Sequence, residues 1–327
     1  MPKAILLEQP GGPENLKWKD IPDPTPAAGE VALKQTVVGL NFIDVYHRNG
    51  LYKLPGYPAI IGMEGVGVIT ALGEGVRALF VGDRVGYGTG PMGAYAQART
   101  IPADKVVKLP DAVLSEIAAA MMLKGLTAYF LARKTFVVGP NHTVLVHAAA
   151  GGVGLLLCQL AKLLGARVIG TVGSEEKAAL ASTNGCEFPI LYKKEDVVKR
   201  VKEITGGEGV HAVYDAVGKD TIGISLDCLM RFGILISYGQ SSGPVPPIDP
   251  LELSRRGSLF LTRPSLMHYM EKAEDHQRSL SELFDLLARG ILKANVGQSY
   301  YLSDAASAHR DLEAAKTTGS TIMITGV

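Results

Sequence analysis

The 327-residue sequence has little cysteine and little aromatic character: three Cys, one Trp, and an aromatic content of 6%. Cys158, Cys186 and Cys228 form no CxxC pair, and an odd number leaves one thiol unpaired in any disulfide scheme. This pattern argues against a disulfide-stapled secreted fold, so we expect reduced, buried thiols and a cytoplasmic protein. The apolar stretch near the N-terminus is too short for a signal peptide, which agrees with that location.

The sequence also lacks an excess of charge of either sign. Its 33 basic and 32 acidic residues give a net charge of +1. Nucleic acid is therefore an improbable principal partner, and so is an anionic membrane surface. A hydrophobic content of 47% and a charged content of 20% are typical of globular proteins, and the length predicts two domains.

One long stretch, residues 143–161, has no charged side chain and is long enough on paper to span a bilayer. Three glycines, Gly151, Gly152 and Gly154, interrupt it at its centre, and no comparable stretch exists to pack against it in lipid. We therefore interpret it as a buried strand and a buried helix of an α/β sheet.

The turn between this strand and helix consists of Ala and Gly only, AAAGGVG. Glycines allow the backbone to approach a pyrophosphate closely, and the helix that follows offers unpaired N–H groups and the positive end of its dipole. The turn lacks the first glycine of the GxGxxG fingerprint, so a plain structural turn is the competing interpretation. The second strand, Arg167–Val172, arrives at the crossover distance of a dinucleotide-binding unit, which favours a phosphate site.

The first 110 residues are predicted to be rich in short strands with Gly and Pro punctuation, as in a compact β-barrel. A short helix at Gly39–Gly50 interrupts them. The expected strands are Lys3–Leu7, Leu16–Asp20, Glu30–Val38, Gly65–Leu72, Asp83–Tyr87, Ala94–Ala98 and Val106–Lys108.

From a helix with Ser115 as its expected N-cap, strands and helices alternate, which predicts a doubly wound, six-stranded parallel Rossmann sheet. The final strand, Ser320–Ile324, has no place in a complete six-stranded sheet, so we expect it to return to the N-terminal domain, with a cleft between the domains. The expected strands are His142–His147, Arg167–Val172, Phe188–Tyr192, Val210–Ala216, Ile234–Tyr238 and Ser258–Thr262, and the expected helices include Ser174–Thr183, Glu195–Ile204, Asp220–Arg231 and Ser303–Ala315.

Asn141–Lys162, NHTVLVHAAAGGVGLLLCQLAK, resembles the signature of the zinc-free quinone oxidoreductase and zeta-crystallin branch of the medium-chain dehydrogenases/reductases. The resemblance extends over nearly the whole chain and is strongest to bacterial quinone oxidoreductases. It implies a GroES-like catalytic domain (1–124 and 265–327) and a Rossmann domain (125–264). The other motifs that carry it are GGPENL, GLNFIDVYHRNGLY, IGMEGVGVI, LKGLTAYFL, TVGSEEK, YDAVG, YGQSSG and GSLFLTRPSL.

Zinc alcohol dehydrogenases of this superfamily place ligands at the positions of Asn41, Met63 and a residue near Leu123. None of these side chains is a normal zinc ligand, and three scattered Cys cannot form a four-Cys structural site. We predict no metal.

NADPH is the expected coenzyme. In folds that select NAD, an acidic residue at the end of the second strand binds the ribose 2'-hydroxyl. Here Gly173 and Ser174 occupy that position, and Lys177 follows one helical turn later. The resemblance assigns Lys177 and Tyr192 to the 2'-phosphate, although Lys177 could also be a solvated residue paired with Glu175 or Glu176. The expected coenzyme contacts are Asn41, Thr127, Ala150, Gly151, Gly152, Val153, Gly173, Ser174, Lys177, Tyr192, Val217, Tyr238, Gly239, Gln240, Ser241 and Arg263.

Without zinc to polarise a carbonyl, a conjugated acceptor such as a quinone is the natural hydride acceptor. We expect Asn41 to donate a hydrogen bond to a ring oxygen, with Tyr46 and Tyr52 as walls or hydroxyl donors; packing is the alternative role for both tyrosines. A 2-alkenal or enone reductase is the alternative enzyme, and a non-catalytic NADPH- or RNA-binding crystallin-like protein is the alternative outside enzymes. The apolar edge strand Ser258–Thr262 predicts a homodimer.

Overall fold

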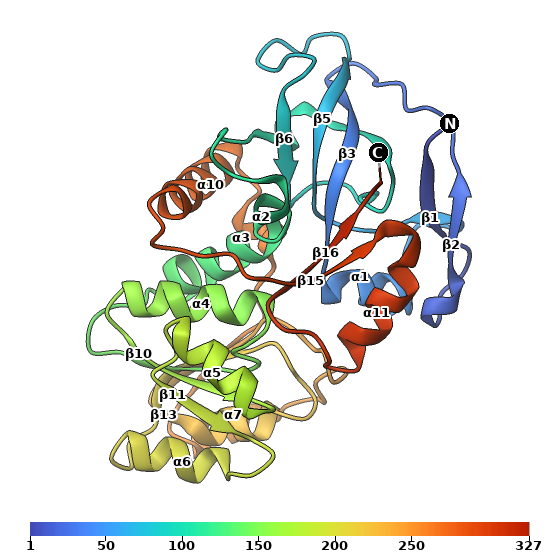
Figure 1. The fold of residues 1–327 in the computed structure, drawn as a ribbon. Coiled ribbons are helices and arrows are strands. Elements are labelled where there is room, and N and C mark those ends of the chain that lie inside the picture. Colours follow the sequence, from blue (N-terminus) through green and yellow to red (C-terminus); the bar gives the residue numbers. More distant parts are fainter. Residues whose placement is uncertain (327) are drawn as a thin grey trace. The chain divides into compact units, whose positions relative to one another are not determined.

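The computed structural model describes residues 1–326 and divides the chain into two compact units. One unit, which we call the β-rich unit, contains Met1–Leu126 and the chain from Met270 onward, and the other, the Rossmann unit, is Thr127–Tyr269. Figure 1 follows the chain through both.

The Rossmann unit is built on a six-stranded sheet in which every neighbouring pair is parallel. The strand order is β11-β10-β9-β12-β13-β14. The chain adds strands from β9 toward one edge and then from β12 toward the other edge, as in a doubly wound fold. This confirms the predicted sheet. Its strands are β9 (Thr143–Val146), β10 (Arg167–Val172), β11 (Phe188–Leu191), β12 (Val210–Asp215), β13 (Leu229–Ser237) and β14 (Phe260–Thr262).

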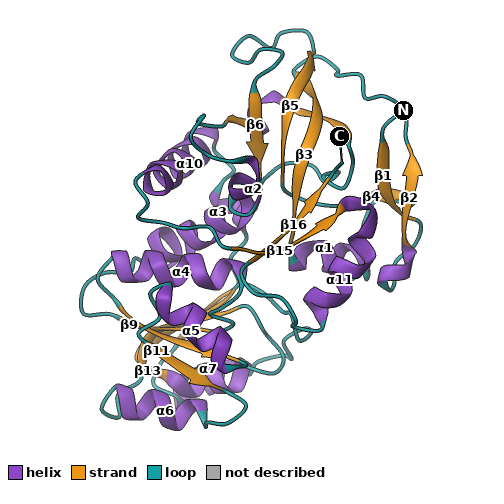
Figure 2. Cartoon of the chain, in the orientation of Figure 1, coloured by secondary structure: helices purple, strands orange, loops and turns teal. Residues whose placement is uncertain are grey.

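Helices cover both faces of this sheet (Figure 2), which is why its strands are apolar on both sides. Apolar residues of α6 and α7 join those of the strands in one core, for example Val201, Leu226 and Leu145. The helices of the unit are α4 (Gly152–Leu163), α5 (Glu175–Thr183), α6 (Val197–Ile204), α7 (Ile222–Cys228), α8 (Pro250–Arg255) and α9 (Leu266–Tyr269).

The β-rich unit contains a seven-stranded sheet and a three-stranded sheet around a second core. Strand β16 pairs antiparallel with β3, so the last strand does return to the first part of the chain as expected. The larger sheet contains β3 (Glu30–Leu40), β5 (Gly65–Leu72), β6 (Arg84–Tyr87), β7 (Ala98–Pro102), β8 (Val107–Lys108), β15 (Val296–Tyr301) and β16 (Ser320–Ile324); the smaller one contains β1 (Lys3–Leu7), β2 (Leu16–Asp20) and β4 (Ala59–Ile60).

The helices beside these sheets include the predicted short helix, which begins at Phe42 with Asn41 as its N-cap. They are α1 (Phe42–Arg48), α2 (Ser115–Ala119), α10 (Ala273–Ala288), α11 (Ala305–Glu313) and the first half of α3 (Met122–Phe130), which continues into the Rossmann unit. Among residues 1–326, no helix combines the length and apolar character needed to cross a membrane.

Three local predictions are wrong. Ser115 is the first helical residue rather than the N-cap, which is Leu114. Residues 94–96 form no regular strand: a single isolated bridge joins Ala96 to Ala4, while Gln35 Nε2 donates to the carbonyls of both Ala94 and Ala96. The helix predicted to reach Arg231 ends at Cys228, because Leu229 already pairs with Val210 in the sheet.

Candidate functional site

The Gly-rich turn joins β9 to α4. Helix α4 begins at Gly152 with Gly151 as its N-cap, and no side chain caps this end. The first N–H groups of a helix have no intrahelical acceptor, so this end offers backbone donors to a ligand. A Cβ at Gly154 would lie 2.3 Å from the Ala148 carbonyl oxygen, so only glycine permits the tight turn. The turn therefore has the geometry of a phosphate cradle.

A buried polar network supports the strand ends beside this turn. His147 Nδ1 lies 2.9 Å from Thr171 Oγ1, its Nε2 lies 3.0 Å from Ser225 Oγ, and Ser225 Oγ donates to Asp215 Oδ2 at 2.7 Å. Burial lowers the pKa of His147. The network ties β9, β10, β12 and α7 together directly behind the turn.

Asp215 also organises the loop after β12. Its Oδ1 accepts hydrogen bonds from the N–H groups of Val217 at 2.8 Å and Gly218 at 3.0 Å. The loop after β13 lies against it, since Ser241 N–H donates to the Ala216 carbonyl at 3.1 Å. The loops after β12 and β13 are therefore joined by hydrogen bonds and position each other.

Other predicted coenzyme residues lie at the same carboxyl edge of the sheet. Tyr238 N–H donates to the Asp215 carbonyl at 2.9 Å, and a Cβ at Gly239 would lie 2.5 Å from the Ala216 oxygen. Arg263 Nη1 donates to the Ser237 carbonyl at 2.7 Å. Gln240 follows Gly239 in the same loop, and Ala150 is buried in the Gly-rich turn.

A second group gathers after β10. Ser174 is the N-cap of α5, and its Oγ accepts from the Lys177 N–H at 3.3 Å. Tyr192 stands beside Gly173, where a Cβ would lie 3.0 Å from the tyrosine oxygen. Burial, and then the charge of Lys193, lower the pKa of Lys177. Glu175 pairs with Lys194 at 2.8 Å, which offsets one of the two acids near this group.

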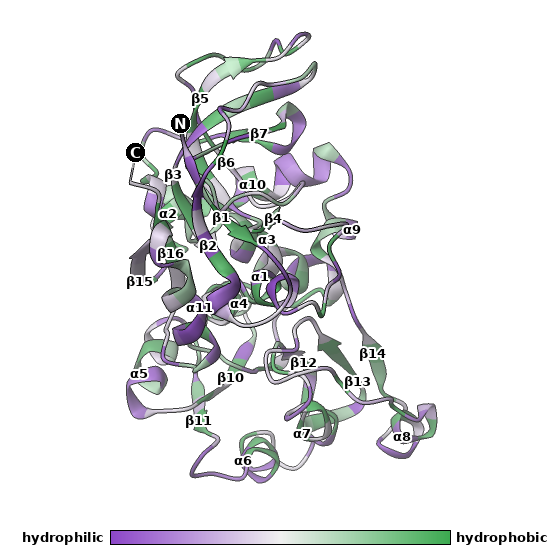
Figure 3. Ribbon diagram, turned by 90° about the vertical axis from the view of Figure 1, so that its right-hand side faces the viewer, coloured by the Kyte–Doolittle hydropathy of each residue, from purple (hydrophilic) through white to green (hydrophobic). Residues whose placement is uncertain are grey.

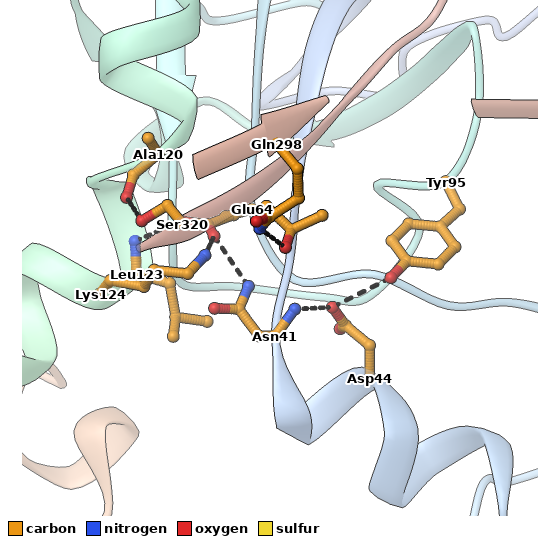
Figure 4. A network of polar contacts seen from close by, with 10 residues as sticks. Asn41, Asp44, Glu64, Tyr95, Ala120, Leu123, Lys124, Gln298 and Ser320 are labelled. Carbon is orange, nitrogen blue, oxygen red and sulfur yellow. Dashed lines mark hydrogen bonds and ion pairs between the residues drawn. The ribbon is translucent and has the colours of Figure 1, made fainter. Parts of the chain in front are cut away.

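In the β-rich unit, the centre of the candidate site is Asn41 at the start of α1. Its main-chain N–H donates to Asp44 Oδ2 at 2.9 Å, and its side-chain Nδ2 donates to Glu64 Oε1 at 2.7 Å. Glu64 also accepts from Lys124 Nζ at 2.6 Å and from the Leu123 N–H at 2.7 Å (Figure 4). We call Asn41, Glu64, Leu123 and Lys124 the Glu64 cluster. It joins three distant segments of the chain around one carboxylate.

Buried titratable groups continue from this cluster along α1. Asp44 Oδ2 accepts from the Tyr95 hydroxyl at 3.2 Å, and burial raises the pKa of Asp44 to about 7. Tyr95 Oη lies 3.0 Å from His309 Nε2, and burial, aided by the charge of Arg48, lowers the pKa of His309 to about 3. Arg48 binds Glu313 through two nitrogens, at 2.7 and 2.8 Å. Both ends of α1 are thus held by buried polar contacts.

The two predicted aromatic walls lie together. The ring centroids of Tyr46 and Tyr52 are 5.2 Å apart with an angle of 63° between the planes, and the His47 ring lies 5.9 Å from Tyr52. Tyr46 is buried, whereas Tyr52 is half-exposed. Thr127, also named as a coenzyme contact, is buried within α3.

The residues at the expected zinc positions do not fit a metal. Asn41 Nδ2 is a hydrogen-bond donor to Glu64, Met63 and Leu123 offer no nitrogen, carboxylate or thiolate, and the nearby Glu64 carboxylate already binds an ammonium group. Within residues 1–326, no three His, Cys, Asp or Glu side chains gather as a metal site.

A cavity of about 920 Å³ lies elsewhere in the β-rich unit, beside α10. Leu280, Phe284 and Val106 help to line it, and none of the predicted site residues does.

Sequence reasoning missed Glu64 and Lys124 as members of the site. A signal existed: each is a lone charge in a run of Gly and apolar residues, IIGMEGVGVI and AAAMMLKGL, and the two charges are opposite. Charged residues in such runs are almost never buried unless paired. Asp44, Tyr95 and His309 gave no comparable signal.

Comparisons with known proteins agree with this architecture. Residues 27–111 match the alcohol dehydrogenase GroES-like domain, and residues 152–289 match the zinc-binding dehydrogenase family. The chain is 47% identical over 324 residues to a quinone oxidoreductase of Pseudomonas aeruginosa, covering 99% of this chain and 100% of the relative. It is 42% identical over 330 residues to a 2-haloacrylate reductase of Burkholderia, with 99% of each chain covered.

A solved structure of Escherichia coli quinone oxidoreductase complexed with NADPH superposes with a TM-score of 0.97 at 46% identity, covering 98% of this chain and 99% of that one. The fold, the two family matches and full-length similarity all point the same way: the chain belongs to the quinone oxidoreductase family of the medium-chain dehydrogenases/reductases.

Proposed function

We propose that this protein is an NADPH:quinone oxidoreductase that works without zinc. The observation that carries the proposal is the uncapped N-terminus of α4 at the Gly-rich turn, together with Gly173 and Ser174, rather than an acid, at the end of β10 where an NAD-selecting carboxylate would stand. Relatives named quinone oxidoreductases, one of them solved with NADPH, support it.

NADPH fits the residues of the Rossmann unit. The N–H groups at Gly152 and Val153 would bind the pyrophosphate, while Ser174, Lys177 and Tyr192 would surround the 2'-phosphate. Lys193 adds positive charge near Lys177. Among the other predicted contacts, Val217 lies in the loop after β12, and Tyr238, Gly239, Gln240 and Ser241 lie in the loop after β13 that packs against it. When bound, NADPH supplies the hydride.

Asn41 orients the acceptor. One hydrogen of its Nδ2 is directed to Glu64, and the second is left for a quinone oxygen, where it stabilises the negative charge that develops during reduction. Tyr46 and Tyr52, whose rings meet edge to face at 5.2 Å, provide an aromatic corner against which a quinone ring packs.

The reaction is tested by its stoichiometry. Purified protein with NADPH and a small quinone should form one hydroquinone per NADPH consumed. A second acceptor class, 2-alkenals, is favoured by the similarity to a 2-haloacrylate reductase, whose name indicates reduction of a conjugated double bond. Turnover of a 2-alkenal without turnover of the quinone would transfer the same site to enone reduction. Tight NADPH binding without turnover of either would indicate a binding role.

We also propose a homodimer formed through the edge of the Rossmann sheet. Strand β14 has one unpaired side within the described chain, and Phe260 and Leu261 are 60% and 39% exposed. Figure 3 shows the hydrophobic colouring of this edge. An exposed apolar edge strand is a template for pairing with a second copy. A Leu261→Lys variant should run as a monomer in gel filtration, and a wild-type monomer at micromolar concentration would contradict the proposal.

The same reasoning leads us to propose that residues 125–264 form the dinucleotide-binding domain, with residues 1–124 and 265–327 as the catalytic domain.

A cytoplasmic location is proposed from the three buried, free thiols Cys158, Cys186 and Cys228. Fractionation of cells that express the tagged protein tests the location.

A further inference from the structure

The Glu64 cluster contains an ion pair buried almost completely in the β-rich unit. The side chain of Glu64 is 0% exposed and that of Lys124 is 7% exposed, and 2.6 Å separates Oε1 from Nζ. Desolvating two charges is costly, and apolar residues of similar volume are often as stable at such sites. A buried pair of this kind is weak evidence for stability, so another role should be sought.

The backbone is adapted to bring the Glu64 carboxylate to Asn41. A Cβ at Gly39 would lie 2.1 Å from Glu64 Oε1, so glycine is required two residues before Asn41. On the other side, a Cβ at Gly88 would lie 2.6 Å from the Leu123 nitrogen, so glycine also allows the start of α3 to come close. Figure 4 shows the side chains of Asn41 and Lys124 converging on Glu64.

The two oxygens of the Glu64 carboxylate accept hydrogen bonds from different donors. Oε2 accepts the Leu123 N–H, whereas Oε1 accepts both Lys124 Nζ and Asn41 Nδ2. A charged acceptor makes a shorter and stronger bond to an amide than a neutral one does. The Asn41 amide is therefore locked with one N–H toward Oε1, which fixes the direction of the other N–H.

We infer that Glu64, with its charge balanced by Lys124, is a positioning residue that orients the Asn41 amide toward the acceptor oxygen. This inference rests on the proposed role of Asn41 in quinone reduction. Lys124 acts through Glu64: its Nζ holds the carboxylate in place at 2.6 Å, and the hydride and proton of the reaction do not pass through either residue.

The test compares two double variants that remove both charges. Glu64→Leu with Lys124→Met deletes the acceptor for Asn41, whereas Glu64→Gln with Lys124→Met keeps a neutral oxygen acceptor. The first should lower kcat with a quinone about 10- to 100-fold with little change in NADPH affinity, and the second should recover most of that loss. Glu8→Leu with Lys19→Met removes a half-exposed ion pair of the same unit and should leave kcat unchanged.

A second readout does not depend on the substrate. The chain has six asparagines, so selective ¹⁵N-asparagine labelling gives six side-chain NH₂ signals, and Asn41→Ala assigns one of them. One hydrogen of the Asn41 amide should exchange slowly with solvent in wild type and in the Gln/Met pair, and quickly in the Leu/Met pair.

The outcomes separate the possibilities. A wild-type kcat in the Leu/Met pair would overturn the inference. An equal loss of kcat in both pairs, with slow exchange of the Asn41 amide hydrogen retained in both, would also overturn it, because the loss would then come from removing the charges. If wild type reduces no quinone, the proposed function fails while the exchange measurement still decides the positioning role. If the Leu/Met pair does not fold, Gly39→Ala displaces the carboxylate with both charges in place and should show the same loss.

Discussion

Tyr95 and His309 are 214 positions apart in the sequence, yet their side chains share a hydrogen bond of 3.0 Å between Oη and Nε2. His309 lies on α11, and Tyr95 also donates to Asp44 on α1. The C-terminal helix is thereby connected through one tyrosine to the helix that begins at Asn41. This buried chain makes the stability of the β-rich unit depend on pH.

Asp44→Asn should make the protein more stable at neutral pH. Burial raises the folded-state pKa of Asp44 to about 7, above its ordinary value of 3.8, so wild type holds a proton that the unfolded chain has lost. The stability from Asp44 is complete below about pH 4 and is lost as pH rises toward 7. Asparagine keeps an oxygen for Asn41 N–H and Tyr95. Urea unfolding at pH 4.5 and pH 8 should show the advantage of the variant growing by a few kcal/mol with pH; an advantage that shrinks with pH would contradict this.

His309→Gln should improve stability relative to wild type at low pH, whereas Asp44→Asn should do so at high pH. Burial lowers the folded pKa of His309 to about 3, below 6.5, so the neutral ring contributes stability above pH 6.5 that is lost as pH falls toward 3. Glutamine does not titrate. Its protein should therefore lose less stability than wild type between pH 7 and pH 4, which thermal unfolding measures; parallel curves for the two proteins would rule out the assignment.

Gly154→Ala should damage the Gly-rich turn. The added methyl would lie 2.3 Å from the Ala148 oxygen and within 2.9 Å of Ala149 backbone atoms, which cannot move as a flexible side chain can. We expect a loss of about 1–3 kcal/mol of stability, as for overpacking, and weaker NADPH binding. Fluorescence titration with NADPH and thermal unfolding measure the two effects.

Gly223→Ala is the matched control for that substitution. Gly223 lies in α7 with nothing within 4 Å of an added Cβ, so alanine should stabilise the protein by about 0.5–1 kcal/mol through helix propensity. Equal effects at residues 154 and 223 would show that the turn is not specially constrained.

The sequence predicted much of this molecule because its signals are local or periodic. The central strands β9, β10 and β12 of the Rossmann sheet are apolar runs that are almost entirely buried, and the short helix at Phe42–Arg48 has a clear cap and a closing glycine. The position of Ala94–Ala96 was not predictable in this way, since the carbonyls of Ala94 and Ala96 accept hydrogen bonds from Gln35, about 60 residues earlier.

In the candidate site, too, local sequence signals were predictable and contacts made only by tertiary packing were not. Gly173, Ser174 and Lys177 follow one strand, where the Lys177 main-chain N–H donates to Ser174 Oγ, and Tyr192 lies beside Gly173 from the end of the next strand. Glu64 and Lys124 meet only through tertiary packing, and a lone charge in an apolar run identifies a buried group without naming its partner. Asn41 was predicted as a donor, but its bond to Glu64 depends on the fold.

Lys177→Glu should change the coenzyme preference. Lys177 lies in the first turn of α5, where its main-chain N–H donates to Ser174 Oγ, and its charge is reinforced by that of Lys193, so reversing it repels a 2'-phosphate. We expect kcat/KM for NADPH to fall at least about 100-fold and that for NADH to change little. Lys199→Glu on α6 makes the same charge change at an exposed position of the Rossmann unit and should affect neither. Equal effects of the two variants would remove Lys177 from the coenzyme site.

The most direct test of the central claim is the initial rate of reduced-nicotinamide oxidation by purified wild-type protein, with NADPH and NADH compared against a small quinone and a 2-alkenal. We predict rapid consumption of NADPH with the quinone and much slower consumption of NADH. A preference for NADH, or no oxidation of NADPH by the quinone, would contradict the account.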